Sequence, residues 1–310
     1  MKRIMIAVVG LLTLTFTAQA QKKSGAIQFE TSLDPVALAA ASGRELNEEM
    51  KARMPKSIKS NFELLFNATN ASYMPVEDAE DSNGGGGGGG MGRMMRFAGG
   101  AGGQREYYYS FADQKLVEVF DIADTTYVMP SKLTVAPPLS LNFGNRPNGN
   151  NNGTTTTTQG GTTTTTVSAV VFLPGPPTME VVKTGETKKI LNYNCNKAIV
   201  KSIRKATILG EEKNIIEETA VWYTNDLGFN FSPNPNLWTE GTVLAIEGKA
   251  SSTVAKSIEF RNVSAKDVTA PKKALPITED QYKTKMEAMM KRFSGGGRQG
   301  NGAPARVNFN

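Results

Sequence analysis

The chain of 310 residues contains no histidine and only one cysteine, Cys195. Histidine is the usual base of serine and cysteine hydrolases and the commonest protein ligand of zinc, so both kinds of site are excluded in their usual forms. A single cysteine cannot form a disulfide within the chain. Cys195 follows a strand-like run, so we expect it to be a small buried residue. The alternative is that Cys195 is a reactive thiol or forms a disulfide with another chain.

The sequence also lacks the short motifs that mark common enzymes and nucleotide-binding sites. Its glycine run, Gly84–Gly90, has no predicted strand before it and no helix after it, so we interpret it as a spacer. Carboxylates are frequent, but the sequence places no pair of them in an identifiable cleft. The acidic segment Glu77–Ser82 lacks the ligand spacing of an EF-hand, and we expect a solvated loop there.

Positive charge is moderate and dispersed along the chain. The formal net charge is +6, of which Lys2 and Arg3 supply two charges, so the remainder carries +4. No dense run of lysine and arginine with interleaved aromatic residues occurs. We therefore expect no nucleic-acid binding.

Long apolar runs are absent except at the N terminus. Residues 1–20 begin with two basic residues, continue with an apolar core through Ile6–Phe16 and end with Ala18-Gln19-Ala20. This is the order of a secretory signal peptide that is cleaved before Gln21. A membrane anchor is the alternative, but the core is shorter than the ~20 residues of a spanning helix. We expect an exported protein of the periplasm or outer membrane, not integral to a membrane after cleavage.

Period-two alternation of apolar and polar residues is the main secondary-structure signal after residue 20. Phe62, Leu64 and Phe66 form the apolar face of one such run, and a turn is expected to follow at Asn67. Short loops between neighbouring runs favour antiparallel pairing. The predicted strands are 25–31, 62–66, 106–109, 115–120, 125–129, 188–193, 220–224, 242–246 and 251–263.

Two segments carry helical signals. An N-terminal helical region is predicted at 36–41 and 44–54, after Asp34-Pro35 and before Pro55. Near the C terminus, Thr278 and Gln281 have the spacing of a capping box, and apolar residues recur at helical spacing over 278–293. The sequence therefore predicts a mainly β protein with minor α content. We expect a curved antiparallel sheet, as a meander or partial barrel, with an N-terminal helical segment and a C-terminal amphipathic helix.

Low-complexity segments interrupt the chain without creating a second domain. Residues 81–105 contain seven consecutive glycines, and residues 142–166 are rich in asparagine, glycine and threonine. Glycine at the density of the first segment costs too much entropy to order, and the second segment has no apolar face to bury. We predict disordered loops at 81–105 and 142–166, a disordered tail at 294–310, and a single β-rich domain over 21–293.

Three segments around Cys195 resemble a known family. They read KILNYNCNKA at 189–198, VWYTNDLG at 221–228 and SPNPNLWTEGTVLAIE at 232–247. In this order they resemble the GLPGLI family of Bacteroidetes envelope proteins. The chain departs from that family at two points. Ser232-Pro233 stands where Gly-Pro is usual, and residues 238–244 stand where the family has the Gly-Leu-Pro-Gly-Leu-Ile motif that gives it its name. It is similar to a divergent member, or to the related DUF4412-type family, which implies an exported β-rich protein with no settled activity.

Methionines occur in two groups with the same spacing. The groups are Met91, Met94 and Met95 in the glycine-rich segment, and Met286, Met289 and Met290 on the predicted C-terminal helix. Thioethers are soft ligands that select Cu(I), so a methionine-based copper site is one reading. The other reading is core packing, because the helix methionines lie on an apolar stripe.

Three classes of function follow from these observations. We favour a non-enzymatic protein of the cell envelope that binds a partner, such as an envelope or outer-membrane protein, which requires an exposed apolar patch. A periplasmic carrier of an apolar, lipid-like ligand is the alternative, and it requires an enclosed and mostly apolar cavity. An enzyme comes third, and it requires clustered ionisable groups with shifted pKa in a pocket.

Overall fold

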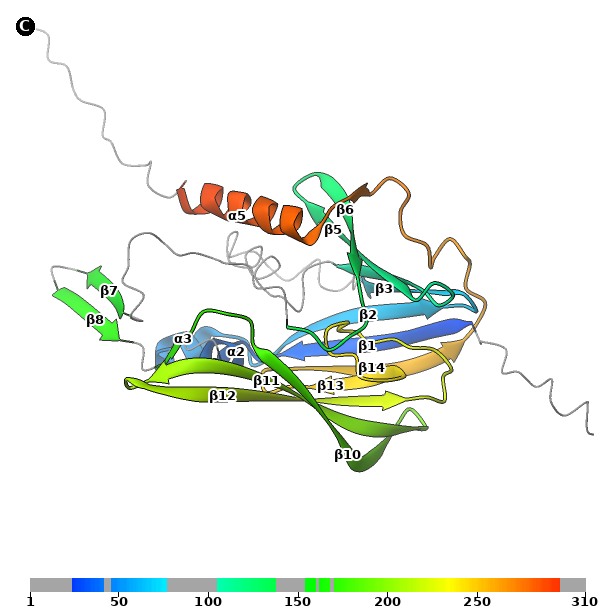
Figure 1. Cartoon of the computed structure of the whole chain (residues 1–310), viewed down its shortest axis with the longest axis horizontal. Helices are drawn as coiled ribbons and strands as arrows, with labels where there is room; N and C mark the ends of the chain where they lie inside the picture. Colours follow the sequence, from blue (N-terminus) through cyan, green and yellow to red (C-terminus); the bar gives the residue numbers. More distant parts are fainter. Residues whose placement is uncertain are drawn as a thin grey trace, which may run out of the picture.

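The computed structural model describes residues 24–41, 46–76, 105–137, 154–159, 162–167 and 170–295. These residues form a mainly β protein, built on one large sheet with three helices around it (Figure 1). The sheet is open, because its outermost strands, β10 (Thr178–Ile190) and β15 (Leu275–Pro276), do not pair with each other. The prediction of a mainly β fold with a large antiparallel sheet is confirmed.

Thirteen of the described strands belong to the main sheet. Besides β10 and β15 they are β1 (Gly25–Leu33), β2 (Ile58–Phe66), β3 (Asn70–Val76), β4 (Glu106–Ser110), β5 (Lys115–Ile122), β6 (Thr125–Ser131), β9 (Val170–Phe172), β11 (Tyr193–Ile208), β12 (Glu211–Thr224), β13 (Thr242–Glu247) and β14 (Ser251–Phe260). The helices are α2 (Pro35–Ala41), α3 (Glu48–Arg53) and α5 (Glu279–Gly295). None of these helices is both long and apolar enough to span a bilayer.

The N-terminal strand β1 lies in the middle of the sheet. The strand order is β10-β11-β12-β13-β14-β1-β2-β3-β4-β5-β6-β15, and β9 pairs with the outer end of β11. From β1 to β6 each strand pairs with the next one in antiparallel orientation, which is the predicted meander. The two-residue strand β15 is the exception, since it pairs with β6 in parallel.

The main core lies on one face of the central strands. Phe62, Leu64 and Phe66 of β2 are all buried, as their period-two spacing predicts, and they pack with Phe29 of β1. Tyr73 stacks on Phe62 with ring centroids 5.2 Å apart. Phe229 and Phe231, from the 225–241 loop, complete this aromatic cluster. Distant segments of the chain thus share one core.

Helix α5 packs against β5 and β6 through a second, smaller core. Thr278 and Gln281 form the predicted capping box: the Gln281 N–H donates to Thr278 Oγ1 (3.3 Å), and the Thr278 N–H donates to Gln281 Oε1 (3.0 Å). Tyr282 and Met286 are buried against Phe120. The predicted amphipathic helix over 278–293 is confirmed.

Several predicted boundaries differ from the structure. The sequence predicts one strand over 188–193, but β10 ends at Ile190 and a turn follows at Leu191-Asn192, where φ is +48° and +70°. The predicted strand 220–224 is only the end of the longer β12. The predicted strand 251–263 ends at Phe260.

The helical region and the threonine-rich insertion also differ in detail. The helix predicted over 44–54 covers 48–53, because Asn47 caps it by accepting the Met50 N–H at 2.7 Å. In the segment predicted as a disordered loop over 142–166, β7 (Thr154–Gln159) and β8 (Thr162–Val167) pair as a separate two-stranded sheet. The β propensity of threonine accounts for strands there. Residues 77–104 and 296–310, which cover most of the other predicted loop and the tail, lie outside the described residues.

Candidate functional site

Three long strands extend beyond the rest of the sheet. β11 and β12 pair without interruption from Asn196↔Tyr223 to Ile208↔Glu211, whereas β13 reaches β12 only at 220–224. The first half of β10 continues this extension on the other side of β11. We call residues 178–183 and 199–219 the wing; in Figure 1 it lies on the side of the sheet far from α5.

The wing exposes aliphatic side chains that the core does not use. Side chains alternate between the two faces of each strand, and on one face Val182, Ile199 and Ala220 lie opposite one another across β10, β11 and β12. Val182 is 43% exposed, and Ile216, farther out on the same face, is 53% exposed. An exposed apolar patch is the feature that a partner-binding surface requires.

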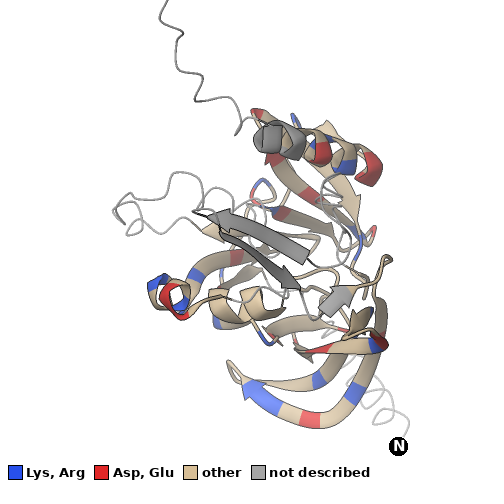
Figure 2. Cartoon of the chain, turned by 90° about the vertical axis from the view of Figure 1, so that its left-hand side faces the viewer, with Lys and Arg blue, Asp and Glu red and all other residues tan. Residues whose placement is uncertain are grey.

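Charged residues divide this apolar surface. Lys201 of β11 lies opposite Glu218 of β12, with Nζ and Oε1 3.1 Å apart. Exposed ion pairs contribute only ~0–1 kcal/mol to stability, so this pair shapes the surface more than it holds the fold. On the side seen in Figure 2, basic and acidic residues are interspersed, without a large patch of one sign. Any recognition by charge therefore depends on local groups of residues.

The outer tip of the wing carries an exposed leucine in a strained position. The β11–β12 turn consists of Leu209 and Gly210, with φ of +52° and +88°. A two-residue turn of this kind favours asparagine and glycine, because other residues avoid positive φ. Leu191 occupies the same position in the β10–β11 turn, but it packs against the main core. Leu209 is 86% exposed, so its packing offsets neither the backbone strain nor the cost of exposing an apolar side chain to water.

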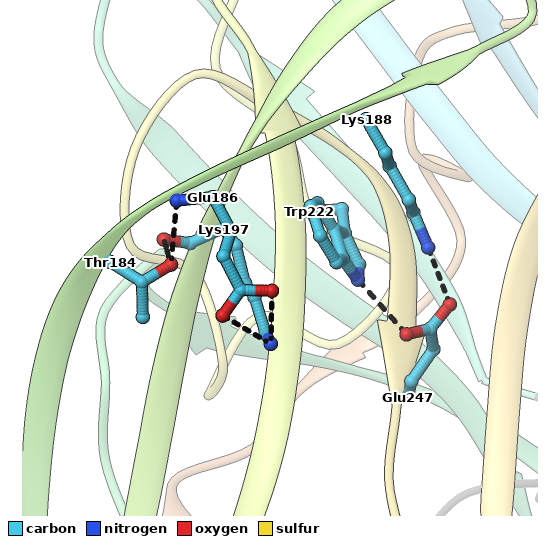
Figure 3. Close-up of polar contacts among 6 residues, drawn as sticks. All are labelled: Thr184, Glu186, Lys188, Lys197, Trp222 and Glu247. Atoms are coloured by element: carbon cyan, nitrogen blue, oxygen red, sulfur yellow. Dashed lines mark hydrogen bonds and ion pairs between the residues drawn. The ribbon is translucent and has the colours of Figure 1, made fainter.

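A network around Trp222 fixes the base of the wing (Figure 3). The Trp222 Nε1–H donates to Glu247 Oε2 at 2.9 Å, and Lys188 Nζ donates to Glu247 Oε1 at 2.6 Å. The same Lys188 ammonium lies 4.1 Å from the centroid of the indole ring, and that of Lys197 lies 5.5 Å from it. Trp222 is buried in the main core, so this network joins three wing strands and β13 to the core.

The charge on Glu247 is stabilised by this network. Partial burial alone would raise its pKa, but the hydrogen bonds from Lys188 and Trp222 outweigh burial and hold the pKa below its ordinary value near 4.5. Lys197 adds a favourable charge from the other side of the ring. Lys197 itself pairs with Glu186, which lies in the β-bulge of β10 between Lys183 and Thr187.

We expect the variant Glu247→Gln to lose less stability in acid than the wild type. Because the folded-state pKa is lowered, the carboxylate stabilises the fold above pH ~4.5, and this contribution disappears as the pH falls through the lowered value. Thermal unfolding from about pH 7 to about pH 3 should show a smaller fall in Tm for the variant. Glu217→Gln, which removes an equal charge from the wing, is the control; equal acid slopes for both variants would contradict this role.

A second carboxylate, Glu240, joins the 225–241 loop to the opposite face of β12. It accepts hydrogen bonds from Lys183 Nζ (2.5 Å), Asn225 Nδ2 (3.2 Å) and the Tyr223 hydroxyl (3.4 Å). The bond from Lys183, followed by that from Asn225, lowers the pKa of Glu240. Glu240 therefore stays charged and ties the loop to the inner end of the wing.

An open cleft lies between the β5–β6 turn and residues 271–275. It encloses about 520 Å³, and its lining includes Glu106, Asp121, Asp124, Lys273 and Leu275. A carrier of an apolar ligand requires an enclosed and mostly apolar cavity. This charged, open cleft gives that alternative no support. Within the described part of the chain, no three acidic or cysteine side chains converge as metal ligands.

The structure separates the sulfur-containing residues that the sequence singled out. Met286 of α5 is buried in the cluster between α5 and strands β5 and β6, and Met289 is partly buried against that cluster. Both methionines therefore serve in core packing. Met290 also belongs to α5. Met91, Met94 and Met95 lie outside the described residues, so copper binding there stays a prediction. Cys195 is fully buried as expected, and burial raises the pKa of its thiol, which disfavours a reactive thiolate.

Glu240 and Glu247 lie within the conspicuous segment 232–247, but nothing in the sequence distinguishes them from its other polar residues. The available signal was their place in the same part of the sequence as Trp222 and Trp238. The lysine partners of Glu240 and Glu247, Lys183 and Lys188, lie 57 and 59 positions earlier in the chain. The wing gives a weak signal for a different reason: over residues 201–219 Ala206 alone is buried, so these strands show no period-two pattern.

Comparisons with known proteins leave this chain without an assigned family. No family model matches it, and no curated protein matches it. Similar solved structures include two of a protein named PNGF-II, in the C2 and P21 space groups. The chain is 13% identical to each, over 85% and 86% of its own length, with TM-scores of 0.44 and 0.42. It spans about a third of those chains (32% and 34%), and so distant a likeness carries no functional argument.

Proposed function

We propose that this chain is an exported protein of the cell envelope that acts without catalysis, by binding a partner protein through the wing. The observation that carries the proposal is the exposed aliphatic surface of the wing. The basic start and apolar core of residues 1–20 support export. The resemblance of 189–198, 221–228 and 232–247 to envelope proteins supports the compartment.

The wing has the composition of a binding surface. Val182, Ile216 and Leu209 expose apolar area and belong to none of the three buried clusters. The Trp222–Glu247–Lys188 network holds the extension rigidly at its base, so a partner would meet a preformed surface. Ion pairs such as Lys201–Glu218 sit between the aliphatic residues and can fix the register of a partner. Surfaces with this mixture are typical of specific protein contacts.

Site-specific photocrosslinking in the native host tests this function. A photoreactive amino acid at position 216 should give one discrete adduct, because Ile216 lies on the wing. The matched control is position 275, since Leu275 is equally exposed at 53% but lies on β15 at the other end of the sheet. The variant Val182→Lys should remove the adduct by placing a charge on the same face. The same adducts from both positions, or none from 216, would contradict the proposal.

Intact-mass analysis of the same preparation tests export. We expect the chain to begin at Gln21, because cleavage after Ala20 removes the signal peptide. A chain that retains residues 1–20 would contradict export while leaving the crosslinking result to be judged by itself.

A further inference from the structure

The outer edge of β12 is open along the wing. β13 pairs with β12 only at 220–224, and among the described strands none pairs with that edge over residues 211–219. The main-chain N–H and C=O groups on this edge therefore face outward, as on any edge strand. Such a row of groups is a template for one more strand.

The two long edges of this region are built differently. The edge formed by β10 is interrupted by a bulge between Lys183 and Thr187, and it carries three lysines, which are the usual features that prevent strand addition. β12 has no bulge over 211–219, because its register with β11 is continuous there. One edge is blunted, whereas the other keeps the regular geometry that a further strand needs.

The open edge is strongly acidic. Residues 211–219 contain four glutamates and one lysine, a net charge of −3. Glu218 pairs with Lys201, and Glu211 pairs with Lys213 at 2.9 Å. Glu212 and Glu217 make no ion pair with any residue that the structure describes. Alternation along the strand places these two carboxylates on opposite faces.

We propose that the partner adds an extended segment to β12 at 211–219, held by main-chain hydrogen bonds, with lysine or arginine side chains at Glu212 and Glu217. This inference rests on the proposed function and names the chemistry of the partner. A second copy of this chain is a poor occupant, because two edges of charge −3 repel each other. A basic segment meets a carboxylate on each face and covers the half-buried Ile215 and the exposed Ile216.

Synthetic peptides test strand addition on the full mature chain. The probe is a short labelled peptide of alternating lysine and valine, and its binding is followed by fluorescence anisotropy. A second peptide has the same sequence, but alternate residues are N-methylated, so that its charge is kept and its main-chain donors are lost. We expect the N-methylated peptide to bind at least about tenfold more weakly, because several hydrogen bonds are removed. Equal binding of the two peptides would overturn the inference.

Two further measurements locate the contact. The double variant Glu212→Gln/Glu217→Gln should weaken binding about fivefold, whereas Glu48→Gln/Glu49→Gln on α3 removes the same charge elsewhere and should change little. Amide hydrogen exchange at 211–219 should slow when the peptide binds; unchanged exchange there would overturn strand addition.

The outcomes separate this inference from the function on which it rests. An adduct from position 216 together with insensitivity to N-methylation would overturn strand addition but keep the wing as a binding surface. The absence of any adduct from position 216 would overturn the proposed function itself. Slowed exchange at 211–219, with loss of binding on N-methylation, supports both.

Discussion

Replacing Arg105 with methionine should lower the free energy of unfolding by about 3–5 kcal/mol. Arg105 Nη1 bonds Glu118 Oε2 at 2.5 Å, and Arg105 Nη2 donates to the Tyr282 hydroxyl at 2.7 Å. The Glu118 side chain is only 9% exposed, so the variant leaves a charge buried with the Ser131 hydroxyl as its remaining donor. Methionine can fill the space beside Phe120, but it removes the guanidinium that lies 5.2 Å from the ring centroid together with its ion pair and hydrogen bonds.

Urea denaturation measures this loss, and the chain supplies a matched control. Arg261→Met removes an arginine whose side chain is 44% exposed and whose ion pairs are at the surface, so we expect a change of about 1 kcal/mol or less. The double variant Arg105→Met/Glu118→Leu should be less destabilised than Arg105→Met, since no buried charge remains. Similar losses for Arg105→Met and Arg261→Met would show that the buried pair does not hold α5 to the sheet.

Replacing Phe29 with alanine should cost about 3–5 kcal/mol of folding free energy. Phe29 is 1% exposed at the centre of the middle strand, with its ring 5.8 Å from that of Tyr73 and 6.2 Å from that of Phe231. The substitution leaves a cavity beside the rings contributed by β3 and the 225–241 loop. The surrounding strands are fixed by pairing on both sides, so they cannot collapse to fill it.

The same substitution at Phe260 is the control for this cavity. Phe260 lies on the neighbouring strand β14 and is 46% exposed, so Phe260→Ala should cost about 1 kcal/mol or less. Both variants are compared by chemical denaturation under identical conditions. Equal losses at the two positions would mean that the central aromatic cluster is not the main source of stability.

The strands around the core were predictable because each has one buried face. Phe62, Leu64 and Phe66 alternate with polar residues, and burial follows that alternation. The capping box at Thr278 and the apolar stripe of α5 are equally local signals. Where one face meets the core and the other meets solvent, sequence period and structure coincide.

The wing and the first turn beside it could not be read in this way. EEKNIIEE is exposed at every position except Ile215, and KSIRKATI is half-buried or exposed except at Ala206, so neither segment alternates regularly between buried and exposed residues. The turn at Leu191-Asn192 contains no glycine, and the apolar pattern runs through it unbroken. The chain reverses there because Leu191 gains packing against the core, which is a tertiary effect.

The polar contacts of Arg105 and Glu240 join segments that are far apart in the sequence and that only the topology brings together. Arg105 borders a glycine-rich segment and was assigned to a disordered loop over 81–105, yet its partner Tyr282 comes from α5. Glu240 likewise meets Lys183 across the edge of the sheet. No local sequence pattern predicts such ion pairs, because each partner is an ordinary charged residue within its own segment.

The central position of β1 has a kinetic consequence. Gly25 pairs with Phe260 and Leu33 with Ser251, so the middle of the sheet joins the start of the described chain to a strand near its end. Sheets with such high contact order fold slowly, since a long loop must close before the pairing is gained. During synthesis β1 can pair early with β2, but it lacks its second neighbour until β14 has been made. A chain cut short before residue 251 would therefore leave one edge of β1 without its partner strand.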